Sequence, residues 1–243
     1  MKKYAFTLAE VLITLGIIGV VAALTIPTLM QKTNDKEIVS ALSKSFSNLS
    51  QAYKLAVLEN GTPDSWNLGE NPERLLTYVI PFLKPTKTCF ESGEQCHEGM
   101  LLKKRGDSVS SGEIFGYDAS GRRVAAVLAD GSIIATFSQN VNCTDVKGTT
   151  PELQNVCGEF MIDVNGIKSP NVYGKDVFIF NITKNSVIPV GASSYTGNDY
   201  KFDTGCLAQD AYGYGCAAWV IYNQNLDYLY CDDLSWNGKT KCD

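Results

Sequence analysis

Two hydrophobic patterns follow one another at the start of the chain. From Val11 to Leu29, nineteen residues carry no charge, which is about the length that a helix needs to cross a bilayer. After Gln31, apolar side chains recur at steps of three and four, the period of a helix with one buried face. These residues are Ile38, Leu42, Phe46, Leu49, Tyr53 and Val57. Asn60-Gly61 is a stop signal, so we expect one long helix, first membrane-spanning and then amphipathic.

Residues 61–243 show the pattern of a single domain that contains a sheet. Asp130-Gly131 separates two apolar runs and suits the two-residue turn of a β-hairpin. The expected strands are 124–128, 132–137, 160–164, 177–182 and 187–190, and a short helix is expected at Glu73 to Leu83. The segment from Cys89 to Gly112 reads as loop-rich and tied by disulfides. The fold class predicted is α+β, with the long helix packed on an antiparallel sheet.

The cysteines of this domain are expected to form disulfides. The eight cysteines all follow the hydrophobic segment, and none forms a C-x-x-C pair: Cys89, Cys96, Cys143, Cys157, Cys206, Cys216, Cys231 and Cys242. With His97 as the single histidine, zinc sites of the finger type are disfavoured, and no metal site is assigned. Disulfides persist outside the cytosol. Pairing of sequence neighbours is the simplest connectivity, although many others are open.

The basic residues at the N-terminus orient the membrane segment. Lys2 and Lys3 precede it, so the positive-inside bias places the N-terminus in the cytoplasm and the cysteine-bearing domain outside. A secretory signal peptide would have a shorter apolar region and a cut after small residues such as Ala22-Ala23. A permanent anchor explains the length but leaves Glu10 without a partner in an apolar helix.

A third interpretation rests on the residues that begin the helix. The run Ala5-Phe6-Thr7-Leu8-Ala9-Glu10 resembles the class III leader of type IV pilins and type II secretion pseudopilins. The resemblance implies that prepilin peptidase cuts between Ala5 and Phe6 and methylates the amine of Phe6. It divides the chain into a leader (1–5), a transmembrane and assembly helix (6–30), its amphipathic continuation (31–60) and a head (61–243). Most members have Gly where this chain has Ala5.

The same resemblance assigns roles within the assembly helix. Glu10 would pair with the new amine of a neighbouring subunit and set its axial register in the fibre, a known use of buried polar groups. Gly16 and Gly19 offer small surfaces on which helices approach closely. Pro27 supplies no backbone N–H to Ala23, so we expect a kink or local unwinding there.

These features imply a structural subunit that is processed and then polymerises into a type IV pilus or a type II secretion pseudopilus. Implied partners are related pilin subunits, prepilin peptidase, the inner-membrane assembly platform and membrane lipid. The expected location is the inner membrane, with the head in the periplasm, and later the fibre, which can extend from the cell surface. The alternative is a membrane-anchored periplasmic binding or adhesion protein that does not polymerise.

Charge and motifs disfavour other classes of function. The net charge of −5 gives no attraction to nucleic acid, and no phosphate loop, nucleophile elbow or metal-ligand helix appears, so no enzyme activity is expected.

The loop from Asp163-Val164-Asn165-Gly166 to Asp176 carries oxygen ligands that suit calcium. Its spacing departs from an EF-hand, and turn formation is the preferred interpretation, so no cofactor is assigned. The aromatic stretch from Gly215 to Cys231 packs against its disulfides or forms a binding surface.

Overall fold

The computed structural model describes residues 7–67, 72–90, 95–100, 114–116, 124–140, 142–168 and 171–243. The chain forms two compact units, Met1–Glu37 and Ile38–Asp243. Helix α1 (Leu8–Asn60) is a 53-residue α-helix that contributes to both units. The single helix predicted from the two hydrophobic patterns is therefore confirmed.

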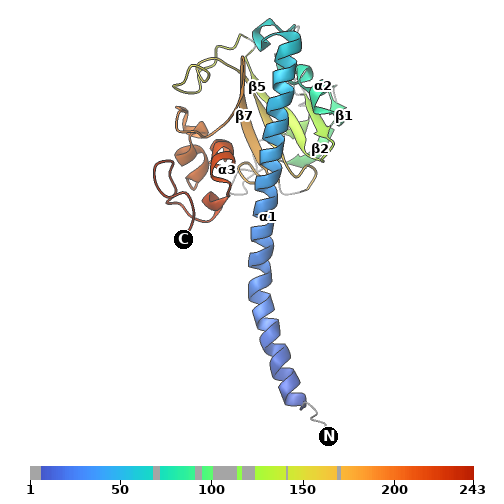
Figure 1. Cartoon of the computed structure of the whole chain (residues 1–243), viewed down its shortest axis with the longest axis vertical. Helices are drawn as coiled ribbons and strands as arrows, with labels where there is room; N and C mark the ends of the chain where they lie inside the picture. Colours follow the sequence, from blue (N-terminus) through green and yellow to red (C-terminus); the bar gives the residue numbers. More distant parts are fainter. Residues whose placement is uncertain are drawn as a thin grey trace. The chain divides into compact units, whose positions relative to one another are not determined.

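Within the second unit, α1 packs on a sheet through one apolar face. The helix buries Ile38, Val39, Leu42, Ser45, Leu49, Ala52, Tyr53 and Ala56, spaced as expected for one stripe of a helix. Figure 1 shows this part of α1 crossing the strands β5 and β7. The rings of Phe46 and Phe180 stack with centroids 5.5 Å apart. The pilin-like α+β architecture predicted from the sequence is confirmed.

The main sheet is antiparallel, with strands in the order β1-β4-β5-β6-β7-β8. Its strands are β1 (Pro85–Cys89), β4 (Ala125–Leu128), β5 (Ile133–Gln139), β6 (Val156–Asp163), β7 (Val177–Thr183) and β8 (Val187–Pro189). The predicted β4–β5 hairpin is present, and Gly131 at its turn has a φ of +86°, which an L side chain rarely adopts. A second sheet pairs β2 (Gln95–Met100) with β3 (Ile114–Gly116).

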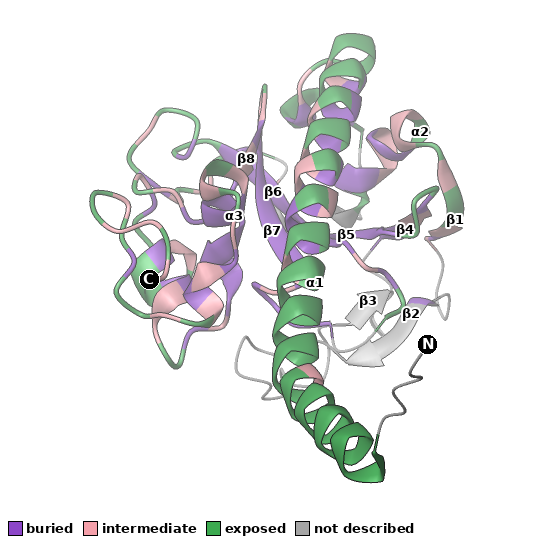
Figure 2. Cartoon of the chain, turned by 60° about the horizontal axis from the view of Figure 1, so that its bottom comes forward, coloured by how far each residue is buried: buried purple, intermediate pink, exposed green. Residues whose placement is uncertain are grey.

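Apolar side chains cover both faces of the main sheet. Phe160 and Phe180 belong to the core under α1, whereas Met161 and Ile179 belong to a second core that includes Tyr173 and other tyrosines. All eight residues of β6 are consequently buried, and the buried colouring of Figure 2 continues along β6 and β7. A strand buried on both faces loses the alternation that marks an exposed one.

One prediction in the first half of the head was wrong. The expected helix at Glu73 to Leu83 is instead a 3-10 helix η2 (Pro72–Tyr78) followed by a short α2 (Ile80–Leu83). Pro81 has no N–H for the carbonyl of Thr77, so a continuous helix is interrupted there. In the segment expected to be loop-rich, β1 ends at Cys89 and β2 begins at Gln95, and a disulfide joins Cys89 to Cys96 as expected.

The regular structure after β8 consists of short helical elements. They are η3 (Asn198–Tyr200), η4 (Asp203–Leu207), η5 (Tyr214–Cys216), α3 (Ala217–Asn223) and η6 (Asp227–Leu229), and η1 (Pro63–Ser65) follows α1. Trp219 of α3 is fully buried, and its ring stacks on that of Phe202 with centroids 4.0 Å apart. This region packs on the same core as α1, so the aromatic stretch is in part a core element.

Candidate functional site

The first turn of α1 is closed by reciprocal hydrogen bonds between Thr7 and Glu10. The backbone N–H and the hydroxyl of Thr7 each donate to Oε2 of Glu10, both at 2.8 Å. The N–H of Glu10 is 3.2 Å from Oγ1 of Thr7 and donates to it. This is a capping box, in which the two residues satisfy N–H groups that the helix leaves free. The signal, Thr7 followed three residues later by Glu10, was present in the sequence but overlooked.

The capping box changes the interpretation of Glu10. From the sequence, an amine released by cleavage was its only expected partner. Within a single subunit, the carboxylate instead has two neutral donors on Thr7. Neutral donors satisfy hydrogen bonds but do not neutralise a charge in an apolar medium, which stays costly. Glu10 is therefore positioned by its own helix and still lacks a cationic partner among the described residues of its unit.

The helix beyond this turn exposes a continuous apolar surface. From Leu8 to Met30, the large apolar side chains of α1 are between 41% and 78% exposed. In the described part of the chain, α1 is the one helix that is long and apolar enough to cross a membrane. A Cβ added at Gly16 or Gly19 would meet nothing within 4 Å. The two glycines thus leave low points on the helix surface where another helix fits closely.

Two predictions about this helix have different outcomes. The helix continues through Pro27, so the expected local unwinding is absent from this structure, although Pro27 still supplies no N–H to the preceding turn. Ala5 and Phe6, the residues on either side of the expected cleavage point, lie outside the described residues. The positions of that peptide bond and of the Phe6 amine therefore remain expectations from the sequence.

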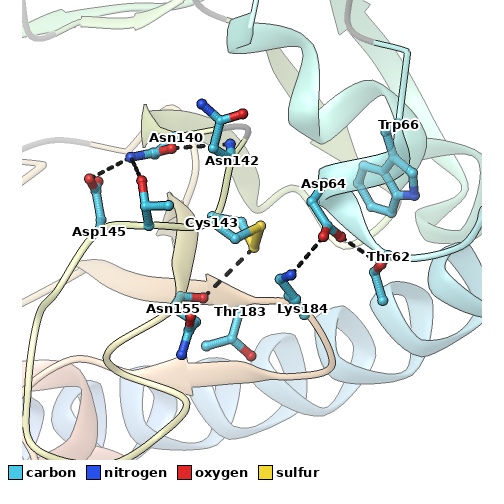
Figure 3. The surroundings of a disulfide bond; sticks show 12 residues. Thr62, Asp64, Trp66, Asn140, Asn142, Cys143, Asp145, Asn155, Thr183 and Lys184 are labelled. Atoms are coloured by element: carbon cyan, nitrogen blue, oxygen red, sulfur yellow. Dashed lines mark hydrogen bonds and ion pairs between the residues drawn. A yellow bond between two sulfur atoms is a disulfide. The ribbon is translucent and has the colours of Figure 1, made fainter.

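Four disulfides join cysteines that are neighbours in the sequence. The pairs are Cys89–Cys96, Cys143–Cys157, Cys206–Cys216 and Cys231–Cys242. Figure 3 shows the surroundings of the pair at Cys143, which ties a polar loop to the start of β6. In that loop Asn140 donates from Nδ2 to Oδ1 of Asp145 at 2.7 Å. Each disulfide of this kind stabilises a small domain by about 2–4 kcal/mol.

The loop from Asp163 to Asp176, for which calcium was the alternative to a turn, contains two buried carboxylates. Oδ1 of Asp163 accepts hydrogen bonds from the N–H groups of Asn165 at 3.0 Å and Gly166 at 2.9 Å. Nδ2 of Asn165 donates to Oδ2 of Asp176 at 3.1 Å. Burial, and then the neighbouring charge of Asp176, raise the pKa of Asp163 to about 8. Burial likewise raises the pKa of Asp176.

The geometry of this loop fits a turn. Asp163 bonds to the backbone two and three residues ahead, which is an Asx-type turn, and Gly166 follows with a φ of +67°. A Cβ at Gly166 would lie 2.0 Å from the carbonyl oxygen of Gly131, so the turn also packs tightly on the β4–β5 hairpin. Among the described residues, no group of three His, Cys, Asp or Glu side chains is arranged to hold a metal ion.

A second buried polar cluster gave no sequence signal. Nζ of Lys147 lies 3.3 Å from Oε1 of Glu159, whose side chain is 1% exposed. The hydroxyl of Tyr200 donates to Oε2 of Glu159 at 3.2 Å. Lys147 comes from the loop before β6 and Tyr200 from η3, so only the tertiary structure brings them to Glu159 on β6. The cluster fastens both segments to the second face of the sheet.

Comparison with known proteins gives one match, at the N-terminus. Residues 1–26 match the family model described as the prokaryotic N-terminal methylation motif. No curated protein and no solved structure matches the chain. The matched residues include the Thr7–Glu10 capping box and most of the exposed apolar helix. The chain thus carries the prepilin-type cleavage and methylation motif typical of type IV pilins and type II secretion pseudopilins, on a pilin-like α+β structure.

Proposed function

We propose that this protein is a structural subunit that polymerises through its N-terminal helix into a type IV pilus or a type II secretion pseudopilus. The observation that carries the proposal is Glu10, held by Thr7 in the first turn of an exposed apolar helix inside the methylation motif. Proteins with this motif are generally processed by prepilin peptidase, anchored in the inner membrane and assembled with pilin subunits. They are generally structural and not enzymes.

The proposed mechanism starts with cleavage between Ala5 and Phe6, which frees a positively charged amine on Phe6. An isolated carboxylate in hydrocarbon is costly, and an amine of a neighbouring subunit lowers that cost when it lies beside Glu10. Subunits are favoured only at the axial position where the two charges meet, so the pair sets register even if it adds little stability. Gly16 and Gly19 permit the close helix approach that this pairing requires.

Processing is tested first, by mass spectrometry of the protein isolated from its native membrane. The proposal expects a mature chain that begins at N-methylated Phe6. A chain that keeps Met1, or one that begins beyond residue 23, contradicts it and favours the membrane-anchored binding protein or the secretory signal peptide. Ala5→Gly, which restores the residue found in most family members, serves as a positive control for cleavage.

Assembly is tested with Glu10→Gln, which keeps an oxygen that accepts from Thr7 but removes the charge. The proposal expects a processed, membrane-inserted subunit that no longer enters filaments sheared from cells. Thr14→Val, on the same exposed helix, is the matched control because it removes a hydroxyl bonded only to its own helix. Normal filament entry by the Glu10→Gln subunit would remove the basis of the proposal.

A further inference from the structure

The disulfide between Cys231 and Cys242 differs from the other three in its exposure. The six cysteines of the other pairs are at most 6% exposed. Cys231 and Cys242 are both partly exposed. Thiol–disulfide exchange requires that a thiolate reach one of the sulfur atoms, so access decides which bond reacts. The Cys231–Cys242 bond is the one that an external thiol can reach in the folded protein.

The loop closed by this disulfide covers buried aromatic side chains. Trp236, inside the loop, lies over Trp219 and Phe202, with ring centroids 5.1 Å and 5.9 Å away. Trp219 is fully buried and Phe202 is 2% exposed. Leu234 of the same loop is 3% exposed. Displacement of the loop therefore exposes an apolar surface next to Tyr222, which is already 64% exposed.

In the part of the chain that the structure describes, few hydrogen bonds attach the loop to the rest of the domain besides the disulfide. Nε1 of Trp236 donates to the carbonyl of Gly191 at 3.0 Å. Nδ2 of Asn225 donates to the carbonyl of Thr240 at 3.0 Å, and the N–H of Cys242 donates to Oδ2 of Asp227 at 2.7 Å. The loop contains no strand or helix of its own. Once its covalent closure is removed, the loop is held mainly by the apolar contacts of Leu234 and Trp236, so it opens locally more readily than the rest of the domain.

We propose that Cys231–Cys242 is a redox-sensitive clasp, whose reduction by a dithiol frees residues 231–243 and uncovers the aromatic surface of Phe202, Trp219 and Tyr222. A thiolate of the dithiol attacks one sulfur, the Cys231–Cys242 bond breaks, and the departing cysteine takes up a proton. The second thiol of the reductant then displaces the other cysteine. Two electrons pass from the dithiol, which ends as a disulfide, to the cysteine pair. This clasp is independent of the proposed fibre assembly.

Selective reduction is the first test. The full chain in detergent is treated with increasing dithiothreitol at native conditions, alkylated with iodoacetamide, and mapped by peptide mass spectrometry. We expect alkyl groups on Cys231 and Cys242 while the other three disulfides remain intact. Earlier labelling of any other pair, or labelling of all eight cysteines together, overturns the proposal.

Loop release is the second test, made at the dithiothreitol concentration that reduces this pair alone. We expect the fluorescence of a dye that binds apolar surfaces to rise, with the far-UV circular dichroism unchanged. The double variant Cys231→Ser/Cys242→Ser should give the raised dye signal without reductant, and the same dithiothreitol should add nothing further. If the pair is reduced and the dye signal stays at the oxidised level, the clasp does not release the loop and the proposal fails.

Discussion

The hydroxyl of Tyr53 on α1 donates a hydrogen bond to the backbone carbonyl of Thr183 at the end of β7. Tyr53 is fully buried, and burial raises the pKa of its phenol far above the ordinary value, so the donor stays protonated at every physiological pH. The bond joins the helix to the last residue of β7. Because Tyr53 lies three residues from Ala56 and four from Leu49, both in the buried stripe, it also fixes which face of α1 meets the sheet.

The first prediction concerns this bond. Tyr53→Phe keeps the ring but removes the donor, so the free energy of unfolding should fall by about 1–2 kcal/mol. Tyr53→Ala should cost more, about 3–5 kcal/mol, because it also leaves a cavity. Denaturant unfolding of the full chain in detergent, followed by circular dichroism, measures both. Tyr222→Phe is the control, since Tyr222 is 64% exposed; equal effects at the two positions would contradict the prediction.

The second prediction concerns pH and Asp163. Its folded-state pKa of about 8 lies above the ordinary value of 3.8, so the folded state holds a proton that the unfolded chain has released. The free energy of unfolding should therefore fall as pH rises from about 4 to 8. The measurement is denaturant unfolding across this range with a chelator present. Stability that rises or stays level across the window would show that the pKa is not raised.

Two variants and one added ion make that measurement specific. Asp163→Asn keeps an acceptor for the N–H groups of Asn165 and Gly166 but cannot titrate, so it should flatten most of the decline. Asp232→Asn, at an exposed position, should keep the decline. Calcium should change neither curve if the loop is a turn. A rise in stability at pH 8 that requires both calcium and Asp163 would instead favour a cation site.

The third prediction concerns the buried ion pair. Lys147→Met leaves the carboxylate of Glu159 buried without its cation, which should cost about 3–5 kcal/mol of unfolding free energy. The double variant Lys147→Met/Glu159→Gln should recover part of this loss, because no charge then remains buried. A double-mutant cycle measures the coupling. Lys239→Met, which removes ion pairs with the exposed carboxylates of Asp233 and Asp243, should cost far less, because exposed ion pairs contribute little to stability. An additive cycle would show that the two side chains act independently.

The fourth prediction concerns the capping box. Thr7→Val removes the hydroxyl that donates to Glu10 and accepts from its N–H, at a cost of about 1 kcal/mol. Amide hydrogen exchange in the first turn of α1 should then accelerate by about fivefold in micelles, since one kcal/mol changes an equilibrium by that factor. Thr7→Ser should leave the exchange rates near those of the parent. Unchanged rates in Thr7→Val would indicate that the cap does not hold the turn.

Much of the architecture could be predicted from the sequence, because it depends on residues that are close together in the chain. The uncharged run from Val11 to Leu29 and the spacing of Leu42, Leu49 and Tyr53 determine a long helix, because helix period and bilayer thickness depend only on nearby residues. Asp130-Gly131 determines the β4–β5 turn for the same reason. The prepilin-type motif is likewise contained in consecutive residues, and so is the capping box of Thr7 and Glu10 that the sequence analysis overlooked.

Only the tertiary structure decided which distant groups meet. Lys147, Glu159 and Tyr200 carry no common motif, and their cluster exists because two loops fold over the second face of the sheet. The burial of Asp163 beside Asp176, which raises its pKa, depends on the pairing of β6 with β7. The covering of Trp219 by Trp236 depends on the loop closed at Cys231 and Cys242. Each of these depends on how strands and loops pack against one another, which residue spacing alone does not specify.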